Sequence, residues 1–304
     1  MELGERALWA LEQATLARAA AVWPVDVPEH VTFALRLEEV WGSCAFAGSA
    51  MTLSQTRALL QRGVVAGDRP FRDYLMVWGY GQASAWVQAH RPPASGPLMT
   101  VGDIRQIHAR ATAGVVLVES AATPGAWRTH NAKPVRSGVV PTPPSMIVSE
   151  VASLVDRYGH RPPAGASRFL WLATFQERLD RIRPFSSAGG RVARLAVNLL
   201  LTRMGLPFMT IPPRSIRAYR EAIARADAGD LYPLALYTAR SVERNLGRFA
   251  PPNDLRPLSA LAGPISLDAL RKAALRGRLR HVYLGSRLCS TAAWRDEYLA
   301  SRST

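Results

Sequence analysis

The sequence predicts a mainly α-helical protein with little β-structure, and three observations support this fold class. Apolar residues recur at the helical spacing of three and four along most of the 304 residues. This pattern is clearest on both sides of one Pro- and Gly-containing loop, residues 183–194. Strand-like patterns occur only in residues 114–140 and 279–290. We therefore expect a helical bundle with a small β-hairpin, followed by a small C-terminal domain.

Residues 1–63 are expected to form an N-terminal helical region. Residues 2–23 carry an amphipathic pattern that ends before a proline, and residues 29–41 carry a second one. Residues 42–48, which are small and bounded by glycine, predict a helix break. The next helix is then expected over residues 52–60.

Residues 64–249 are expected to form the core of the bundle. An apolar pattern with two tryptophans and a tyrosine predicts a long helix over residues 68–90. Thr100 and Asp103 have the spacing of a capping box, so a helix should begin there. Residues 114–140 carry the only β-like pattern of this region. Three further helices are expected over residues 145–158, 215–228 and 231–249.

Residues 250–257 have the Pro-rich composition of a linker, and residues 258–304 are expected to form a separate unit. Ser266 and Thr291 each stand where a hydroxyl would cap a following helix. Between these helices, residues 279–290 predict a hairpin that turns at Gly285 and Ser286. The unit therefore reads as helix, turn, helix, hairpin and helix.

The composition is strongly basic, with a formal charge of +15 and a sequence pI of about 11.0. Only two of the 38 basic residues are lysine, which is typical of a GC-rich genome, so the local placement of charge is more informative than its total. No apolar run reaches the length of a membrane span. Two scattered cysteines are too few for a disulfide framework or a metal site. We expect a cytoplasmic protein with no membrane partner.

The loop over residues 183–194 has the features of an anion-binding site. Pro184 ends the preceding helix, and Gly189 with Gly190 is expected to let the backbone turn closely before the next helix. The amides at a helix N-terminus attract anions, and Arg191 with Arg194 would face the same way. A phosphate-bearing ligand is the natural occupant. The alternative is a helix–loop–helix with two solvated arginines.

The same residues resemble the signature of the Fic family, His-Pro-Phe-x-(Asp/Glu)-Gly-Asn-Gly-Arg-x-x-Arg. Five positions match: Pro184, Phe185, Gly190, Arg191 and Arg194. Arg183 stands at the histidine and Ser187 at the acidic residue, while Ala188 and Gly189 replace the first glycine and the asparagine. The resemblance implies a Fic-fold helical bundle with a β-hairpin flap.

Members of that family transfer AMP from ATP to a hydroxyl of a target protein, with the histidine as base and the acidic residue holding magnesium. A guanidinium at Arg183 cannot accept a proton near neutral pH, and a hydroxyl at Ser187 is a poor magnesium ligand. We therefore expect no confident catalytic residue and no metal. His130, in the expected flap, is the substitute base to consider. The expected ligand is ATP, another nucleotide or a phosphorylated molecule, bound by Arg183, Ser187, Gly189, Gly190, Arg191 and Arg194.

Two further segments resemble parts of Fic proteins. Ser43, Ala47 and Gly48 have the spacing of the family's inhibitory segment, whose glutamate pairs with the second motif arginine. Because Ala47 stands at that glutamate, inhibition by an ion pair is not expected. Trp127, Arg128 and Thr129 resemble the flap, which positions a target segment by strand addition.

The C-terminal unit resembles winged helix–turn–helix modules of the excisionase type. Residues 255–304 contain nine Arg or Lys against three Asp or Glu. Arg271, Lys272 and Arg276 would lie on the recognition helix and Arg287 on the wing, where they would meet DNA phosphates. The alternative is a module for dimerisation or protein docking, and a homodimer is a candidate assembly.

Three functions follow from this reading. The leading one is a degenerate Fic-fold protein that binds a nucleotide or phosphorylated ligand and acts by binding, with an unidentified target protein. The first alternative is an atypical transferase or lyase that works without a histidine base. The second is a DNA-binding regulator whose Fic domain mediates assembly.

Overall fold

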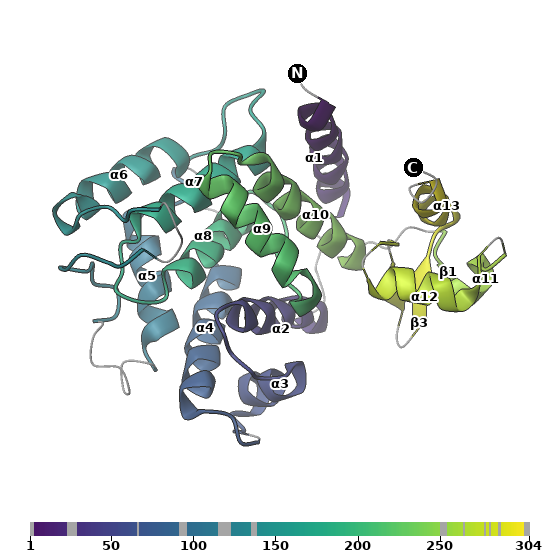
Figure 1. The fold of residues 1–304 in the computed structure, drawn as a ribbon, viewed down its shortest axis with the longest axis horizontal. Helices are drawn as coiled ribbons and strands as arrows, with labels where there is room; N and C mark the ends of the chain where they lie inside the picture. Colours follow the sequence, from purple (N-terminus) through teal and green to yellow (C-terminus); the bar gives the residue numbers. More distant parts are fainter. Residues whose placement is uncertain are drawn as a thin grey trace. The chain divides into compact units, whose positions relative to one another are not determined.

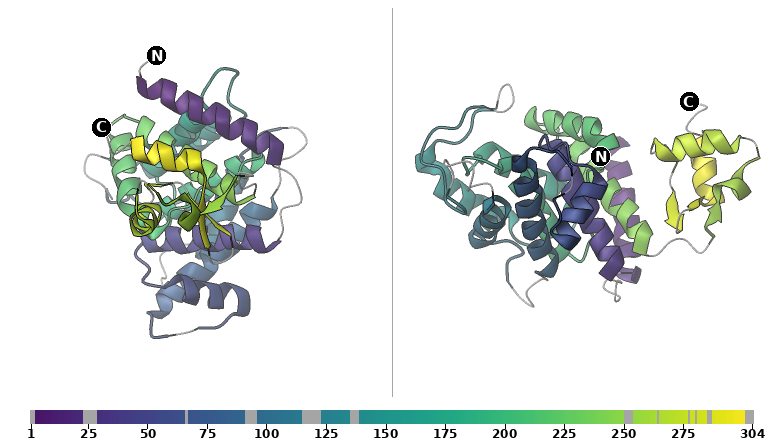
Figure 2. Two further views of the ribbon diagram at one scale, coloured as in Figure 1. Left: turned by 90° about the vertical axis from the view of Figure 1, so that its right-hand side faces the viewer. Right: turned by 90° about the horizontal axis from the view of Figure 1, so that it is seen from below.

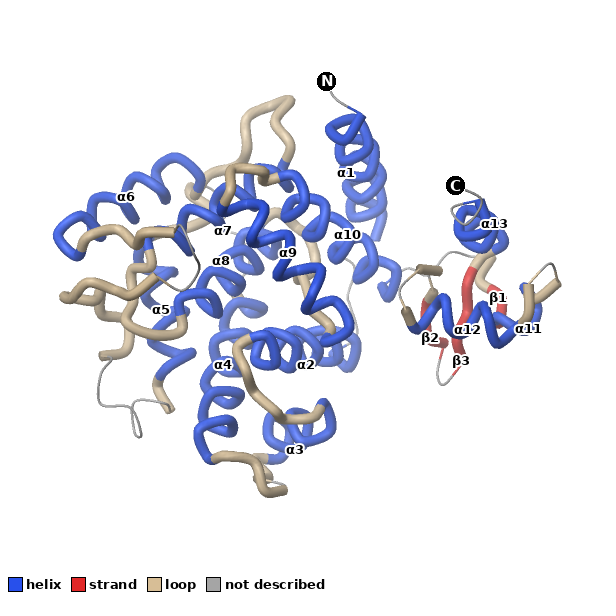
Figure 3. The backbone as a smooth tube through the Cα atoms, in the orientation of Figure 1, coloured by secondary structure: helices blue, strands red, loops and turns tan. Residues whose placement is uncertain are grey.

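The computed structural model describes residues 3–22, 29–65, 67–90, 96–114, 123–134, 139–249, 254–263, 265–276, 278–279, 281–284 and 287–300. The chain forms two compact units, residues 1–242 and 243–304. Figure 1 shows the order of the elements, and Figure 3 shows that most of the regular structure is helical, as the sequence predicts. None of the described helices combines the length and apolar content that crossing a membrane requires.

The first unit is built from ten helices in the part that the structure describes, the last of which continues into the second unit. They are α1 (Leu3–Val22), α2 (Glu29–Phe46), α3 (Leu53–Arg62), α4 (Phe71–Ala89), α5 (Val101–Thr112), α6 (Ile147–Tyr158), α7 (Arg168–Ile182), α8 (Gly189–Arg203), α9 (Ile216–Asp227) and α10 (Tyr232–Phe249). Short 3₁₀ turns, η2 (Pro144–Met146) and η3 (Pro213–Ser215), lead into α6 and α9.

Helix α8 is the centre of the first unit. Every side chain from Arg191 to Leu201 is buried, which requires neighbours on all sides of the helix. It packs against α7, α4, α5 and α2, and Figures 1 and 2 show these helices around it. The loop that precedes α8 therefore lies where several helices meet.

The helix caps agree with local sequence signals. Thr100 and Asp103 form the expected capping box at α5, with the Asp103 amide donating to the threonine hydroxyl at 3.0 Å. Thr52 and Gln55 form another at α3. These caps depend on residues three positions apart, so tertiary structure does not alter them.

The predicted helix break at residues 42–48 is wrong, because α2 continues to Phe46. Gly42 is helical and lies against the backbone after α8: a Cβ there would be 1.9 Å from the Ile211 carbonyl oxygen. The glycine therefore allows close packing rather than ending the helix. The chain turns instead at Gly48, whose φ is +100°.

The predicted hairpin over residues 114–140 falls partly on residues 115–122 and 135–138, which lie outside the described residues. In the described part, residues 123–134 and 139–140 are irregular and no strand is assigned. These residues are attached to the bundle by side chains, chiefly Arg128.

The described residues of the second unit form a small antiparallel sheet and three short helices. The elements are β1 (Arg256–Pro257), α11 (Leu258–Leu261), α12 (Leu267–Leu275), β2 (Val282–Leu284), β3 (Arg287–Ser290) and α13 (Ala292–Ala300). The strand order is β1–β3–β2, with Arg256 opposite Ser290 and Leu284 opposite Arg287. The predicted caps are present: Ser266 accepts from the Ala269 amide at 3.3 Å and Thr291 from the Trp294 amide at 3.1 Å.

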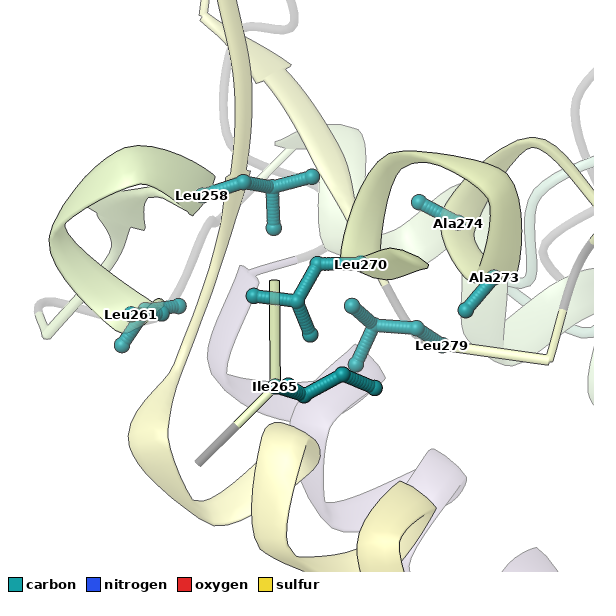
Figure 4. Close-up of a cluster of buried hydrophobic side chains, with 7 residues drawn as sticks. All are labelled: Leu258, Leu261, Ile265, Leu270, Ala273, Ala274 and Leu279. Carbon is teal, nitrogen blue, oxygen red and sulfur yellow. The ribbon is translucent and has the colours of Figure 1, made fainter. Parts of the chain in front are cut away.

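One apolar cluster holds this unit together (Figure 4). It consists of Leu258, Leu261, Ile265, Leu270, Ala273, Ala274 and Leu279, and Leu288 of β3 packs against it. Strand β1 was missing from the sequence prediction, which assigned residues 250–257 to a linker. Two residues, one of them proline, show no alternation that would reveal a strand.

Candidate functional site

The loop between α7 and α8 begins and ends with a left-handed residue. Arg183 has φ +48° and its amide donates to the Leu179 carbonyl at 3.1 Å, which ends α7. Ala188 has φ +60° and is the N-cap of α8. The sequence assigned the turn to Gly189 and Gly190, but both lie inside the first turn of α8. The turn is made by an alanine, which costs about 1–2 kcal/mol in this conformation.

The start of α8 is open to an acceptor. Ala188 has no polar side chain, and no side-chain cap satisfies the first amides of the helix. The amides of the first turn have no partner within a helix and concentrate positive potential there. Anion binding at this end of α8 stays a prediction, for which the uncapped amides are one supporting feature.

Arg191 adds a buried cation at the same end of the helix. Its side chain is 9% exposed, and its Nη1 atom has no hydrogen-bond partner in the described part of the chain. Burial lowers the pKa of the guanidinium, and the neighbouring charges of Arg194 and Arg72 lower it further. An unpaired buried donor is costly, and an anion would relieve that cost.

Arg194 is also buried, but it is held by α2. Its Nε donates to the Ser43 hydroxyl at 2.9 Å and a terminal nitrogen donates to the Ser43 carbonyl at 3.0 Å. Its guanidinium lies 4.9 Å from the centre of the Phe46 ring. The alternative of two solvated arginines is therefore wrong for both Arg191 and Arg194.

Behind Ser43 lies a buried carboxylate. The Ser43 hydroxyl donates to Glu39 at 3.3 Å, and Glu39 also accepts from Tyr80 at 2.6 Å and Ser84 at 2.8 Å. Burial raises the pKa of Glu39, while these donors and the charge of Arg194 oppose that shift. Of the three residues compared with an inhibitory segment, Ser43 contacts the second motif arginine, Ala47 is exposed and Gly48 forms the turn.

The residues compared with a flap are attached to the loop through Arg128. Its side chain is 3% exposed and donates to the carbonyls of Arg183 at 2.7 Å, His130 at 2.8 Å and Ile182 at 3.3 Å, and also to that of Thr142. Its own amide donates to the Pro184 carbonyl at 3.0 Å.

The two residues next to Arg128 in the sequence differ in their contacts with the loop. The Trp127 ring lies 4.9 Å from that of Phe185, a motif residue, whereas Thr129 is exposed. Burial lowers the pKa of Arg128, as does the charge of Arg183. The loop and residues 127–129 are therefore one connected structure.

His108 is a neighbour of the loop that the sequence analysis missed. Its ring stacks on Phe185, with centres 3.8 Å apart and planes 2° apart. Its Nδ1 accepts from the Gly125 amide at 2.9 Å, and the ring also interacts with the Ser187 backbone in the loop. Burial lowers its pKa to about 4, helped by the charge of Arg191. The one feature of the sequence that could have indicated its burial is its position four residues after Ile104, on the buried face of α5.

The site offers little to a metal ion. No group of three His, Cys, Asp or Glu side chains in the described ranges could hold one. The hydroxyl of Ser187 occupies the motif's acidic position, and the nearby carboxylate of Asp180 interacts with Arg194. These residues do not fit a magnesium site.

A cavity of about 530 Å³ lies elsewhere, between α6, α7 and the turn after α9. Glu150, Glu177 and Arg178 are among its lining residues, and no residue of the loop 183–194 lines it.

In the second unit, the candidate DNA-binding residues are all on the surface. Arg271, Lys272 and Arg276 are exposed on or next to α12, and Arg287 is exposed at the start of β3. Lys272 pairs with Asp268 at 2.7 Å.

Comparisons with known sequences agree with this architecture. Residues 98–201 match the model of the Fic/DOC family. Protein adenylyltransferase fic-1 of Caenorhabditis elegans is 25% identical over 210 residues, which cover 69% of this chain and 40% of that protein. Protein adenylyltransferase Fic of Nematostella vectensis is 26% identical over 221 residues, which cover 73% and 50%. The chain thus spans about half or less of the length of these curated relatives.

Solved structures show the same fold. Fic-1 from C. elegans superposes with a TM-score of 0.67 at 20% identity, over 81% of this chain and 72% of that one. A Fic family protein from Desulfovibrio desulfuricans G20 superposes with a TM-score of 0.63 at 15% identity, over 96% of both chains. The fold is therefore the mainly α-helical Fic fold.

Proposed function

Because residues 98–201 belong to the Fic/DOC family and the chain is homologous to Fic adenylyltransferases, we propose that its loop 183–194 binds a nucleotide or another phosphate-bearing ligand. We further propose that the protein acts by binding, without the ordinary transfer of AMP to a protein hydroxyl.

The observation that carries the proposal is the buried Nη1 of Arg191, which has no partner among the described residues and belongs to the first turn of a helix without a side-chain N-cap. Amides and a guanidinium together are the groups that proteins use for phosphate. Arg191 is buried, so a phosphate oxygen would meet it in a low-dielectric environment, where the attraction is stronger than in water. Ser187, Gly189 and Gly190 would supply backbone contacts to the same ligand.

The other two arginines of the motif, Arg194 and Arg183, would contribute to ligand binding in different ways. Arg194 is held to Ser43 through Nε and one terminal nitrogen, and its other terminal nitrogen lies beside Gly190 in the first turn of α8, where it would meet a ligand. Arg183 carries a permanent charge beside the loop and would help to neutralise a polyphosphate without a metal.

The argument against ordinary AMP transfer concerns the base. Arg183 replaces the histidine and stays protonated near neutral pH. His108 is close to the loop, but it is 1% exposed and its Nδ1 is occupied by Gly125. His130 is exposed, and its contact with the loop is through its carbonyl to Arg128. These contacts give neither histidine the role of the motif's base in this proposal.

Two alternatives remain open to experiment. An atypical transferase or lyase would use the same loop with a different base, and a mass increase on a co-incubated protein or on the chain itself would establish it. A regulator that acts through DNA would place the function in the second unit.

The test of the proposal is a calorimetric titration of ATP into the whole protein, with and without magnesium. We expect ATP to bind without magnesium. Arg191→Ala should weaken this binding at least about tenfold, because the substitution removes a hydrogen bond to a charged group. Arg178→Ala, which removes an exposed cation from α7, is the matched control and should bind as the unchanged protein does.

Thermal unfolding of both variants separates a lost contact from a lost fold. If neither ATP, ADP nor inorganic pyrophosphate binds, or if Arg191→Ala binds as well as Arg178→Ala while both remain folded, the loop is not a phosphate site.

A further inference from the structure

The second unit exposes a group of cations that its fold does not need. Arg271, Lys272, Arg276, Arg278 and Arg287, here called the basic surface, are all exposed and lie outside the apolar cluster of this unit. We propose that the basic surface binds duplex nucleic acid through its phosphates, without reading the base sequence. This is independent of any ligand at the loop 183–194.

The geometry of α12 separates its two faces. Leu270, Ala273 and Ala274 point into the apolar cluster, as Figure 4 shows, so the residues between them point outward. Arg271 and Lys272 occupy that outer face, and Arg276 follows as the C-cap. An exposed face of this kind presents several guanidinium or ammonium groups within one turn or two of helix, a spacing suited to successive phosphates.

Strand β3 also carries a cation on the side that faces away from the apolar cluster. Leu288 packs on the apolar cluster, and because side chains alternate along a strand, its neighbour Arg287 points away from it. Arg287 is accordingly exposed at the start of the strand. Helix and strand are thus both anchored by apolar residues and both carry cations outward.

The acidic residues of the unit do not cancel this charge. Asp268 is the one acidic residue on α12, and its carboxylate pairs with Lys272 at 2.7 Å. Both partners are exposed, and an exposed pair contributes little to stability. A phosphate can therefore replace Asp268 as the partner of Lys272 at small cost, while the three arginines of α12 and the residues just after it keep their full charge.

The unit lacks the amide side chains that read adenine, although Arg and Lys can pair with guanine. Residues 254–304 contain no Asn and no Gln, the side chains that pair with adenine in the major groove. The exposed residue between Lys272 and Arg276 is Leu275, at 53% exposure, which offers no hydrogen bond to a base edge. Arginines on phosphates position a protein on a duplex but carry no sequence information.

The experiment is a fluorescence-anisotropy titration of the whole protein with two unrelated 20-base-pair duplexes, one A·T-rich and one G·C-rich. Salt is varied from about 50 to 200 mM, the range over which phosphate contacts change affinity most clearly. We expect the two duplexes to bind within about threefold of each other. Four or five phosphate contacts at about 0.9 each give a slope of log affinity against log salt near −4.

The decisive variant is Arg271→Ala with Lys272→Ala, which should reduce that slope by about 2 for either duplex. Arg217→Ala with Arg240→Ala in the first unit is the matched control. Arg217 is exposed and pairs with Glu221 four residues away, as Lys272 pairs with Asp268, and Arg240 is exposed. The control should leave both affinity and slope unchanged, and circular dichroism should show both double variants folded.

Four outcomes would overturn the proposal. They are no duplex binding at 50 mM salt, an equal loss in the control variant, a preference of a hundredfold or more for one duplex, and binding to phosphatidylserine vesicles with none to duplex. The third would indicate a sequence-reading regulator, and the fourth an acidic membrane surface as the partner.

Discussion

Arg194 and Ser43, which are 151 positions apart in the sequence, are joined by two hydrogen bonds: Nε to the hydroxyl at 2.9 Å and a terminal nitrogen to the carbonyl at 3.0 Å. The serine hydroxyl also donates to the buried Glu39, so it links the guanidinium of Arg194 to that carboxyl group. No carboxylate is present at Ala47, yet the second motif arginine is still held by α2.

Ser43→Ala should therefore destabilise the protein by about 1–3 kcal/mol, because Arg194 and Glu39 each lose a buried partner. The measurement is the free energy of unfolding from a denaturant titration. Ser149→Ala is the control, since its hydroxyl donates to the Met146 carbonyl on an exposed turn, and it should change stability by less than about 0.5 kcal/mol. Equal effects of the two changes would mean that the contact between Ser43 and Arg194 contributes nothing to stability.

Ala188→Gly should stabilise the protein, by up to about 1 kcal/mol. Ala188 has φ +60°, a conformation that costs an L-residue about 1–2 kcal/mol, and the gain is offset in part by the greater freedom of glycine in the unfolded chain. Thermal unfolding measures the change. Ala218→Gly, at an exposed position inside α9, should lose about 1 kcal/mol, so the two substitutions should have opposite signs.

Gly42→Ala should be strongly destabilising, by about 3 kcal/mol or more, since its Cβ would lie 1.9 Å from the Ile211 carbonyl oxygen and the backbone would have to move. Gly102→Ala in the first turn of α5 is the matched change, with its Cβ 3.5 Å from the Thr100 hydroxyl, an ordinary contact. Denaturant titrations of both should show a large loss for the first and none for the second. A tolerated alanine at position 42 would contradict the close packing of α2.

Stability should fall in acid because of His108. Its pKa is about 4 in the folded protein and 6.5 in the unfolded chain, so below pH 6.5 the unfolded state binds a proton that the folded state excludes. The stability is fully present above pH 6.5 and is lost as the pH falls towards 4, by up to about 3 kcal/mol.

His108→Asn tests this dependence, because its amide oxygen can still accept from Gly125 and does not titrate. The pH dependence of the unfolding free energy between 4.5 and 6.5 should become shallower by about 1.4 kcal/mol per pH unit. His130→Asn, at an exposed position, is the control and should keep the original slope. An unchanged slope in His108→Asn would place the acid sensitivity elsewhere.

The features that were predicted well from the sequence are those that depend on residues close to one another in the chain. Thr100, Ser266 and Thr291 each cap a helix through an amide three positions away. The local sequence is therefore enough to predict these caps. The boundaries of α4 and α9 followed from periodicity in the same way. The fold class was predictable because α8 is flanked by strongly periodic helices.

The features that sequence missed depend on tertiary contacts. Gly42 looks like a helix breaker until Ile211 is placed against it. His108 lies 77 positions before Phe185, and nothing local shows that the two rings stack. Ala188 looked less suited to a sharp turn than the two glycines that follow it, yet it takes the left-handed conformation because the start of α8 is fixed by packing.

The hydrogen bonds of Arg128 reach the nearby carbonyls of His130 and Thr142 and also that of Arg183, 55 positions away. These bonds restrict the backbone of residues 127–129 before any partner arrives. A protein that docked there would therefore have less chain to order on binding. Recognition there would depend on whether the partner's shape fits, and association would proceed without a folding step.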